Sequence, residues 1–222
     1  MNGLAFDFCG ETLSALPSGA LFWPARRLLC VSDLHLGKSD RMARRGGPML
    51  PPYETLDTLD RLGADIAATD PETVICLGDS FDDLAAGRDM TRDLKDRLIS
   101  LMAGRRWIWI EGNHDPGPLD FGGTHLADHA VNPLVFRHIA EHAAMGEVSG
   151  HYHPKARISV KGRVLSRRCL LVDDARLILP AYGTYTGGLF SDRPELSGLM
   201  AADARAILVG PRPVCLPMPR HA

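Results

Sequence analysis

The chain has 222 residues, of which 45% are hydrophobic and 23% charged, and its formal net charge at pH 7 is -2. This balance is that of a soluble globular protein, and the length suits one large domain or two small ones. A net charge so close to zero gives no overall attraction to nucleic acid or to an anionic membrane. A chain of this length folds without a disulfide or a structural metal, so any metal site is expected to be functional.

The five cysteines are scattered along the chain and form no CxxC pair; they stand at positions 9, 30, 76, 169 and 215. Most lie inside apolar runs, where a free cysteine behaves as a small hydrophobic residue. This usage indicates a reducing, cytoplasmic setting. The N-terminal stretch MNGLAFDFCGETL lacks the pattern of a signal peptide. We expect no membrane span, because no apolar run approaches the roughly 18 residues that one requires.

The first half of the chain alternates predicted strands with predicted helices. Apolar, β-prone runs predict buried strands in RRLLCVSDLHLG, TVICLGDS and RRWIWIEGNHD. Two stretches with leucines at helical spacing predict amphipathic helices. The buried faces are expected to hold Leu56, Leu59, Leu62 and Ile66 in the first helix, and Leu94, Leu98 and Leu101 in the second, which Gly104 ends. This alternation indicates an α/β sheet with parallel strands.

The second half is predicted to consist of short strands joined by turns. Strand-like runs occur in GEVSGHYHPKARISV, RCLLVDDARLILPAYG and RAILVGPRPVCLPM, with little helical pattern between them. A second sheet packed on the first is therefore expected. Only the modest loop DPGPLDFGGTH separates the halves, so we expect a single domain over residues 1–222.

Polar clusters follow the predicted strands of the first half. The carboxyl ends of parallel neighbours meet at one edge of a sheet, so these clusters are expected to lie close together. A further pair of histidines, separated by one residue, would share one face of an extended segment in the second half. The clusters are SDLH, with Asp33 and His35; GDSFDD, with Asp79; GNHD, with Asn113, His114 and Asp115; and GHYH, with His151 and His153.

This pool of side chains offers carboxylate, imidazole and amide groups but no thiolate. Ligands of that kind suit manganese, iron, zinc or cobalt better than calcium, and the absence of cysteine disfavours a structural zinc site. The pool is large enough for two metals that share one carboxylate. Two metals roughly 3.5–4 Å apart form the clamp that enzymes use for in-line displacement at phosphorus.

In this order, the motifs D-x-H, GDxxD, GNHD and GHxH resemble those of the calcineurin-like metallophosphoesterases. They span Asp33 to His153, more than half of the chain, and each follows a β-prone run. The resemblance implies an α/β fold with two packed mixed β-sheets flanked by helices, a four-layer αββα sandwich. The family often has Arg directly after GDxxD, and this chain departs from that pattern with Asp83.

The family pattern also contains a single histidine before GHxH. His138, in LVFRHIA, is our choice because it follows a short apolar run; His142, His129 and His125 are the alternatives. With this choice, the resemblance implies one metal bound by Asp33, His35, Asp79 and His153 and another bound by Asp79, Asn113, His138 and His151. The shared Asp79 would bridge two divalent transition metal ions, manganese first, with iron or zinc as alternatives.

The same resemblance implies how the site would act. Water or hydroxide held between the ions would attack phosphorus. His114 would stabilise the developing charge or protonate the leaving oxygen, and Asp115 would orient the imidazole of His114.

Further stretches narrow the resemblance. DLHLGK before an Arg-rich helix, GHYHP and LPAYGTYTGGL look like the bacterial ligase-associated DNA damage response endonuclease/phosphoesterase subgroup. This implies a nuclease or phosphodiesterase acting on DNA in repair, with functional association with a DNA ligase and a helicase. The alternatives are a phosphodiesterase or phosphatase for a small nucleotide, and a non-catalytic binding module of the same fold. The sequence leaves the oligomeric state open.

Each of these residue types also has a structural interpretation. Asp33 and Asp79 could cap helices, and GNHD by itself could be a turn. Asp82 and Asp83 are expected to be solvated or to cap a helix. Trp107 and Trp109 alternate on a strand and are expected in the core.

Two further clusters leave alternatives open. The basic residues after DLHLG form either a solvated helix face or a contact for phosphate; they are Lys38, Arg41, Arg44 and Arg45. The Gly-rich stretch PAYGTYTGG either lines the site or makes tight turns with packed tyrosines; its candidates are Tyr182, Tyr185 and Thr186.

Overall fold

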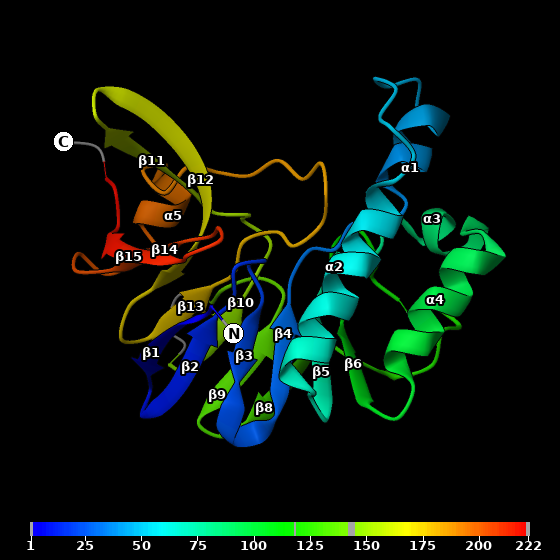
Figure 1. The fold of residues 1–222 in the computed structure, drawn as a ribbon, viewed down its shortest axis with the longest axis horizontal. Coiled ribbons are helices and arrows are strands. Elements are labelled where there is room, and N and C mark those ends of the chain that lie inside the picture. Colours follow the sequence, from blue (N-terminus) through cyan, green and yellow to red (C-terminus); the bar gives the residue numbers. More distant parts are fainter. Residues whose placement is uncertain (1, 118, 142–144, 221–222) are drawn as a thin grey trace.

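The computed structural model describes residues 2–117, 119–141 and 145–220. Two mixed β-sheets pack face to face, as Figure 1 shows. The first sheet has seven strands in chain order: β1 (Leu4–Phe8), β2 (Glu11–Ala15), β3 (Leu21–Trp23), β4 (Leu28–Val31), β5 (Thr73–Leu77), β6 (Arg106–Ile110) and β7 (Thr124–Leu126). Its first four strands are antiparallel, and β4 to β7 are parallel.

The second sheet has eight strands and contains most of the second half of the chain. Its order is β15 (Val214–Pro217), β14 (Arg205–Leu208), β12 (Arg163–Val172), β13 (Arg176–Ile178), β10 (Glu147–Ser149), β9 (Leu134–Arg137) and β8 (Asp128–Val131). β11 (Lys155–Val160) pairs with β12 outside this path. β10 runs parallel to both of its neighbours, so the loops after β9 and β10 lie at one end of the sheet.

The outer face of the first sheet is covered by longer helices than that of the second sheet. α2 (Glu54–Thr69) and α4 (Arg92–Met102) cover the first sheet, while α1 (Lys38–Arg44) and α3 (Leu84–Asp89) lie after β4 and β5. The second sheet is covered by α5 (Pro194–Ser197) and the segment that follows it. A short 3₁₀ turn, Pro24–Arg26, precedes β4. Among the described residues, no helix combines the length and apolar character needed to cross a bilayer.

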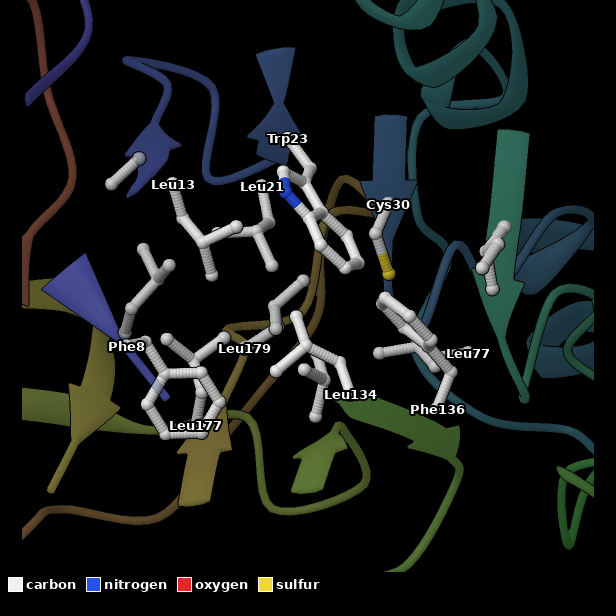
Figure 2. Close-up of a cluster of buried hydrophobic side chains, with 14 of the residues drawn as sticks. Phe8, Leu13, Leu21, Trp23, Cys30, Leu77, Leu134, Phe136, Leu177 and Leu179 are labelled. Carbon is white, nitrogen blue, oxygen red and sulfur yellow. The ribbon is translucent and has the colours of Figure 1, made fainter. Parts of the chain in front are cut away.

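The core between the sheets is mainly aliphatic and contains a few large aromatic rings. Trp23 and Phe136 are 1% and 0% exposed, and Figure 2 shows them among aliphatic side chains that come from both sheets. Alternate residues of β4, β5 and β6 point to the two faces of the first sheet. One set joins this core, and the other packs against α2 and α4. The buried strands that carry the polar clusters are thus held from both sides.

The expected α/β sandwich is confirmed, with differences in detail. The predicted helices and the strands β4, β5 and β6 form, and Trp107 and Trp109 lie in the core. Leu56, expected on the buried face of α2, is 46% exposed, because Thr55 and Thr58 take the buried positions beside Leu59. The sequence patterns missed the N-terminal hairpin strands β1 and β2, which alternate buried with more exposed residues and lack the continuous apolar run of β4, β5 and β6.

Replacing Phe136 by Ala tests how strongly the two sheets are coupled. Removing a fully buried aromatic ring should lower the free energy of unfolding by about 3–5 kcal/mol, through lost transfer energy and the cavity left behind. Urea denaturation measures this loss. The control is Val214→Ala at a 52% exposed position, where a change within about 0.5 kcal/mol is expected. An equally small effect at Phe136 would contradict a shared core.

Candidate metal centre

The loops after β4, β5 and β6 meet at one edge of the first sheet. The backbone N–H of His35 donates to the carbonyl of Asp79 at 2.9 Å, and that of Leu36 donates to Ser80 at 2.9 Å. The three loops are therefore tied to one another beyond the ends of their strands. This follows from the parallel register of β4, β5 and β6, which places equivalent ends side by side.

The first group of candidate ligands joins both halves of the chain. Asp33 and His35 come from the loop after β4, and His153 comes from the loop between β10 and β11. Nε2 of His153 lies 3.1 Å from Oδ1 of Asp33 and 3.4 Å from Nε2 of His35. Asp33 is fully buried and His35 is 3% exposed.

The second group surrounds Nε2 of His138, in the loop after β9. This atom lies 3.0 Å from Oδ1 of Asn113, 3.4 Å from Oδ2 of Asp79 and 3.3 Å from Nδ1 of His151. Of the other candidates for this position, His125 stacks on Trp109, His129 lies on β8, and His142 is outside the described residues. The structure thus brings together, in two groups, the seven residues that were predicted as metal ligands.

The hydrogen bonds of the histidine rings indicate which kind of ion the two groups of residues could bind. Nδ1 of His138 lies 2.8 Å from the carbonyl of Leu77, and Nδ1 of His35 lies 2.7 Å from Oδ1 of Asp82. In the neutral form of each ring the proton therefore lies on Nδ1, so Nε2 is the atom that could bind a metal in the centre. There it meets further acceptors, such as Oδ1 of Asn113. Acceptors that converge in this way fit a cation, and this mixture of N and O atoms fits a divalent transition metal.

The charges agree with this interpretation. Burial would lower the pKa of His138, but hydrogen bonding to Asp79 and the charge of Asp33 outweigh it and raise the pKa to about 9. Burial would raise the pKa of Asp79, yet His138 lowers it to about 2. The two carboxylates thus stabilise a positive charge at this position. A divalent cation would take over that role from the proton on His138.

The backbone of the ligand loops adopts a conformation that is uncommon for residues other than glycine. Among the residues that the structure describes, ten such residues have φ in the left-handed region, and five of them are candidate ligands, with φ from 45° to 68°: Asp33, His35, Asp79, His151 and His153. This conformation costs of order 1–3 kcal/mol per residue and persists where the surrounding structure enforces it. The tight turns aim successive side chains at one point.

Two glycines allow the ligand loops to approach each other. Gly78 has φ +72°, and a Cβ there would lie 2.4 Å from Nδ1 of His138. A Cβ at Gly150 would lie 1.8 Å from Oγ of Ser32. These are the glycines of the GD and GH motifs. At each position a larger residue would collide with a neighbouring loop, so only glycine fits before the candidate ligand.

Asp82 is neither solvated nor a helix cap, contrary to expectation. Its side chain is fully buried, and Oδ1 contacts Nδ1 of His35 at 2.7 Å and Nζ of Lys38 at 3.1 Å. Oδ2 accepts from Arg41 at 2.8 Å. Asp82 therefore holds the ring of His35 and its tautomer, while two cations stabilise its charge. Asp83 does cap a helix, since it accepts from the N–H of Ala86 at the start of α3.

Asp115 does not orient His114, contrary to expectation. Its carboxylate accepts from the N–H groups of Ser80, Phe81 and Gly112 at 2.8–3.2 Å, and it thereby joins the loops after β5 and β6. Burial raises its pKa to about 7 against these donors. Nδ1 of His114 instead lies 2.8 Å from the carbonyl of Asp82. Side chains of adjacent residues in a tight loop point in different directions. Proximity in sequence therefore does not bring Asp115 into contact with the ring of His114.

The surroundings of His114 carry both basic and acidic side chains. A hollow of about 230 Å³ is lined by Arg41, Arg45, Asp82, Asp83, Asn113 and His114. Lys38, Arg41 and Arg44 form ion pairs with Asp82 or Asp83. Lys38 and Arg41 are therefore held beside the site, whereas Arg44 and Arg45 remain exposed at the end of the helix.

The Gly-rich segment after β13 lies on the loop that carries Asp33. The N–H of Tyr182 donates to Ser32 at 2.7 Å, and that of Gly183 donates to Asp33 at 3.1 Å. The ring of Tyr182 is buried, and its hydroxyl donates to Asp65 at 2.9 Å. Tyr185 is 41% exposed and lines a hollow with Arg61, Arg168 and Thr186. Tyr182 thus packs, and the other two residues lie at the surface.

The contact between Asp82 and His35 predicts the effect of Asp82→Asn. Loss of the carboxylate weakens the orientation and basicity of the His35 ring, so the Kd for manganese should rise 10–100-fold. Isothermal titration calorimetry on the metal-free protein measures this. The matched control is Asp83→Asn, which keeps the helix cap and should leave the Kd near that of the wild type. Equal weakening by both variants would argue against the positioning role.

Comparison with known proteins agrees with this geometry. The sequence model of the calcineurin-like phosphoesterases matches residues 26–179, which include all the candidate ligands. The crystal structure of Pseudomonas putida nuclease MPE is similar, with a TM-score of 0.73 and 28% sequence identity over 96% of this chain and 100% of that chain. This likeness to a nuclease is consistent with the subgroup that the motifs suggested. No curated protein matches the sequence.

The matched segment covers well over half of the chain and both groups of ligands. The protein belongs to the calcineurin-like phosphoesterase family and is a metal-dependent hydrolase that acts on phosphoester bonds.

Proposed function

We propose that the protein is a dinuclear, manganese-dependent nuclease that cleaves phosphodiester bonds of DNA during repair. The observation that carries this proposal is the convergence of seven candidate ligands, in two groups, from loops of both sheets. The similarity to a nuclease supports a nucleic acid substrate. The resemblance to the ligase-associated subgroup supports a repair role alongside a DNA ligase and a helicase. Five free cysteines are compatible with a cytoplasmic setting.

Each group of ligands would hold one ion. Asp33, His35 and His153 form the first set, and Asn113, His138 and His151 form the second together with Asp79. Oδ1 of Asp79 accepts the N–H of His114 at 2.8 Å, which fixes the orientation of the carboxylate that the two ions would share. When bound, two divalent cations generate a nucleophile from water near neutral pH and offset the charge of the phosphate.

His114 is placed to assist at the reacting phosphate. Its Nδ1 is bound to the carbonyl of Asp82, so its Nε2 is free to face a substrate in the hollow shared with Asn113. A proton held on this Nε2 can pass to the leaving oxygen or stabilise charge on a phosphoryl oxygen. Asp115 keeps the loop of Asn113 and His114 fixed against the loop of Asp79.

Turnover of bis-p-nitrophenyl phosphate with added manganese tests the proposed metal centre. The wild type should bind two manganese ions per chain and hydrolyse the diester. Asp79→Asn should lose both metal and activity, because it removes the charge shared by the two groups. His138→Ala should lose at least one ion, whereas His129→Ala, outside the centre, should keep two. A wild type that binds two ions and cleaves no phosphoester would support the non-catalytic alternative.

His114→Ala separates catalysis from metal binding. The variant should retain both ions, because His114 belongs to neither proposed ligand set. Loss of a positioned proton donor should lower kcat about 10²–10⁴-fold. Metal content by atomic spectroscopy and steady-state kinetics check the two halves of this prediction. A normal kcat, or loss of an ion, would remove His114 from the assigned role.

The choice of substrate needs a separate comparison. Single-stranded and nicked oligonucleotides should be cleaved with a higher kcat/KM than a cyclic mononucleotide if DNA is the substrate. The reverse order would favour a phosphodiesterase for a small nucleotide.

A further inference from the structure

The ribbon formed by β11 and β12 has an unusual charge. No Asp or Glu occurs between Glu147 and Asp173, whereas this interval contains six basic residues: Lys155, Arg157, Lys161, Arg163, Arg167 and Arg168. The two strands pair from Lys155 opposite Arg168 to Val160 opposite Arg163, with the turn at Lys161 and Gly162. The net charge of -2 for the whole chain conceals this local excess of positive charge.

The ribbon projects from the sandwich. Figure 1 shows it rising at the upper left beyond the sheets, while α1 with its arginines stands at the upper right. The orange segment after β13 runs between them, and it includes the Gly-rich residues that lie on the Asp33 loop. The ribbon and α1 thus stand on either side of the metal centre, at the end of the molecule where the ligand loops meet.

Three basic side chains of this ribbon are exposed without an ionic partner among the described residues. Lys161 and Arg163 lie at the tip and Arg167 lies nearer the base, and no described carboxylate forms an ion pair with any of them. Arg157, midway along β11, pairs with Asp192 at 3.5 Å and lies over the ring of Phe190. Arg168, at the base, donates to the carbonyl of Ala181. Arg157 and Arg168 are therefore anchored, whereas the other three side chains offer free positive charge, two of them at the tip.

The ribbon is continuous with the metal centre. His153, a candidate ligand, is followed by Pro154 and then by the first residue of β11. Six strand residues rise about 20 Å. At about 3.4 Å per nucleotide along a DNA strand, the tip would be reached by about six nucleotides. A substrate held at the metals could contact the tip of the ribbon only if it were a polymer.

We propose that the β11–β12 ribbon is an arm that binds the phosphodiester backbone of a polynucleotide whose scissile bond lies at the metal centre. This inference rests on the proposed function and adds a second binding surface to it. Exposed cations without acidic neighbours bind phosphates irrespective of base sequence, and the binding releases counterions. The arm supplies affinity for long substrates and takes no part in the reaction at phosphorus.

The test is the triple variant Lys161→Ser, Arg163→Ser and Arg167→Ser. KM for an oligonucleotide of about 20 nucleotides should rise roughly tenfold, because three phosphate contacts are lost. A dinucleotide and bis-p-nitrophenyl phosphate are too short to reach Lys161 and Arg163 at the tip, so their kcat/KM should change far less than that of the oligonucleotide. The slope of log Kd against log salt for the oligonucleotide should fall by about 2, from roughly 0.7 per contact on a single strand.

Two further variants separate charge from folding. The triple variant Arg26→Ser, Arg106→Ser and Arg205→Ser removes three exposed cations that lie before or at the starts of β4, β6 and β14, away from the ligand loops. It should leave oligonucleotide binding near that of the wild type. Lys161→Arg with Arg163→Lys and Arg167→Lys keeps the charge and should retain affinity. An equal loss in the first control, or a loss in the second, would overturn the inference.

Binding to the metal-free protein keeps this test independent of catalysis. Fluorescence anisotropy with labelled DNA, labelled RNA and anionic vesicles measures the arm alone, so failure of the diester assay would affect only the proposed function. Equal weakening for DNA and RNA in the Ser variant is the expected result. Unchanged affinity for both, or an effect on vesicles alone, would overturn the inference.

Discussion

The metal centre depends on one electrostatic constraint: buried carboxylate, amide and imidazole groups converge at one place. Nδ1 of His35 and of His138 is committed to Asp82 and to Leu77, so their Nε2 atoms turn toward carboxylate and amide oxygens. Such an arrangement is unfavourable without a positive charge. Because this arrangement is costly in free energy, much of the neighbouring structure serves to hold these side chains in place.

The features that hold the side chains in place belong mainly to the backbone. Left-handed φ angles at five ligands turn each loop sharply, and glycines remove the Cβ atoms that would collide. Asp115 ties two of the loops together through three N–H groups. Rigid strands buried on both faces support the loops, because the core between the sheets and the layer under α2 and α4 hold β4, β5 and β6 from either side. Accurate placement of ligands thus follows from packing that is remote from the site.

Charge is distributed unevenly around this centre. Acidic residues inside it are paired with cations of α1, where Asp82 contacts Lys38 and Arg41. The ribbon on the other side carries cations and no acids. A chain with almost no net charge can therefore offer an anionic polymer a positive surface, since attraction acts over roughly one Debye length, about 8 Å at physiological salt. Whole-chain charge, used alone, underestimates this possibility.

The amino-acid sequence by itself determined the family and the identities of the candidate ligands, because chemistry at a metal demands particular residue types at short, fixed spacings. It also determined the strands β4, β5 and β6, whose apolar runs are continuous, and the helices α2 and α4, whose apolar period is long enough to detect. Strands that mix buried and exposed residues, such as β1 and β8, carry a weaker signal. Their pairing comes from contacts distant in sequence.

Only the tertiary structure decided which neighbour each side chain uses. Asp115 stands next to His114 in sequence but binds backbone amides, while Asp82, taken for a solvated or capping residue, holds His35 from another loop. The position of His138 beside Asn113 and His151 required the second sheet to pack on the first. Local spacing restricts which atoms a residue can offer. The direction in which it offers them is set by loop torsions and sheet packing, which involve residues far apart along the chain.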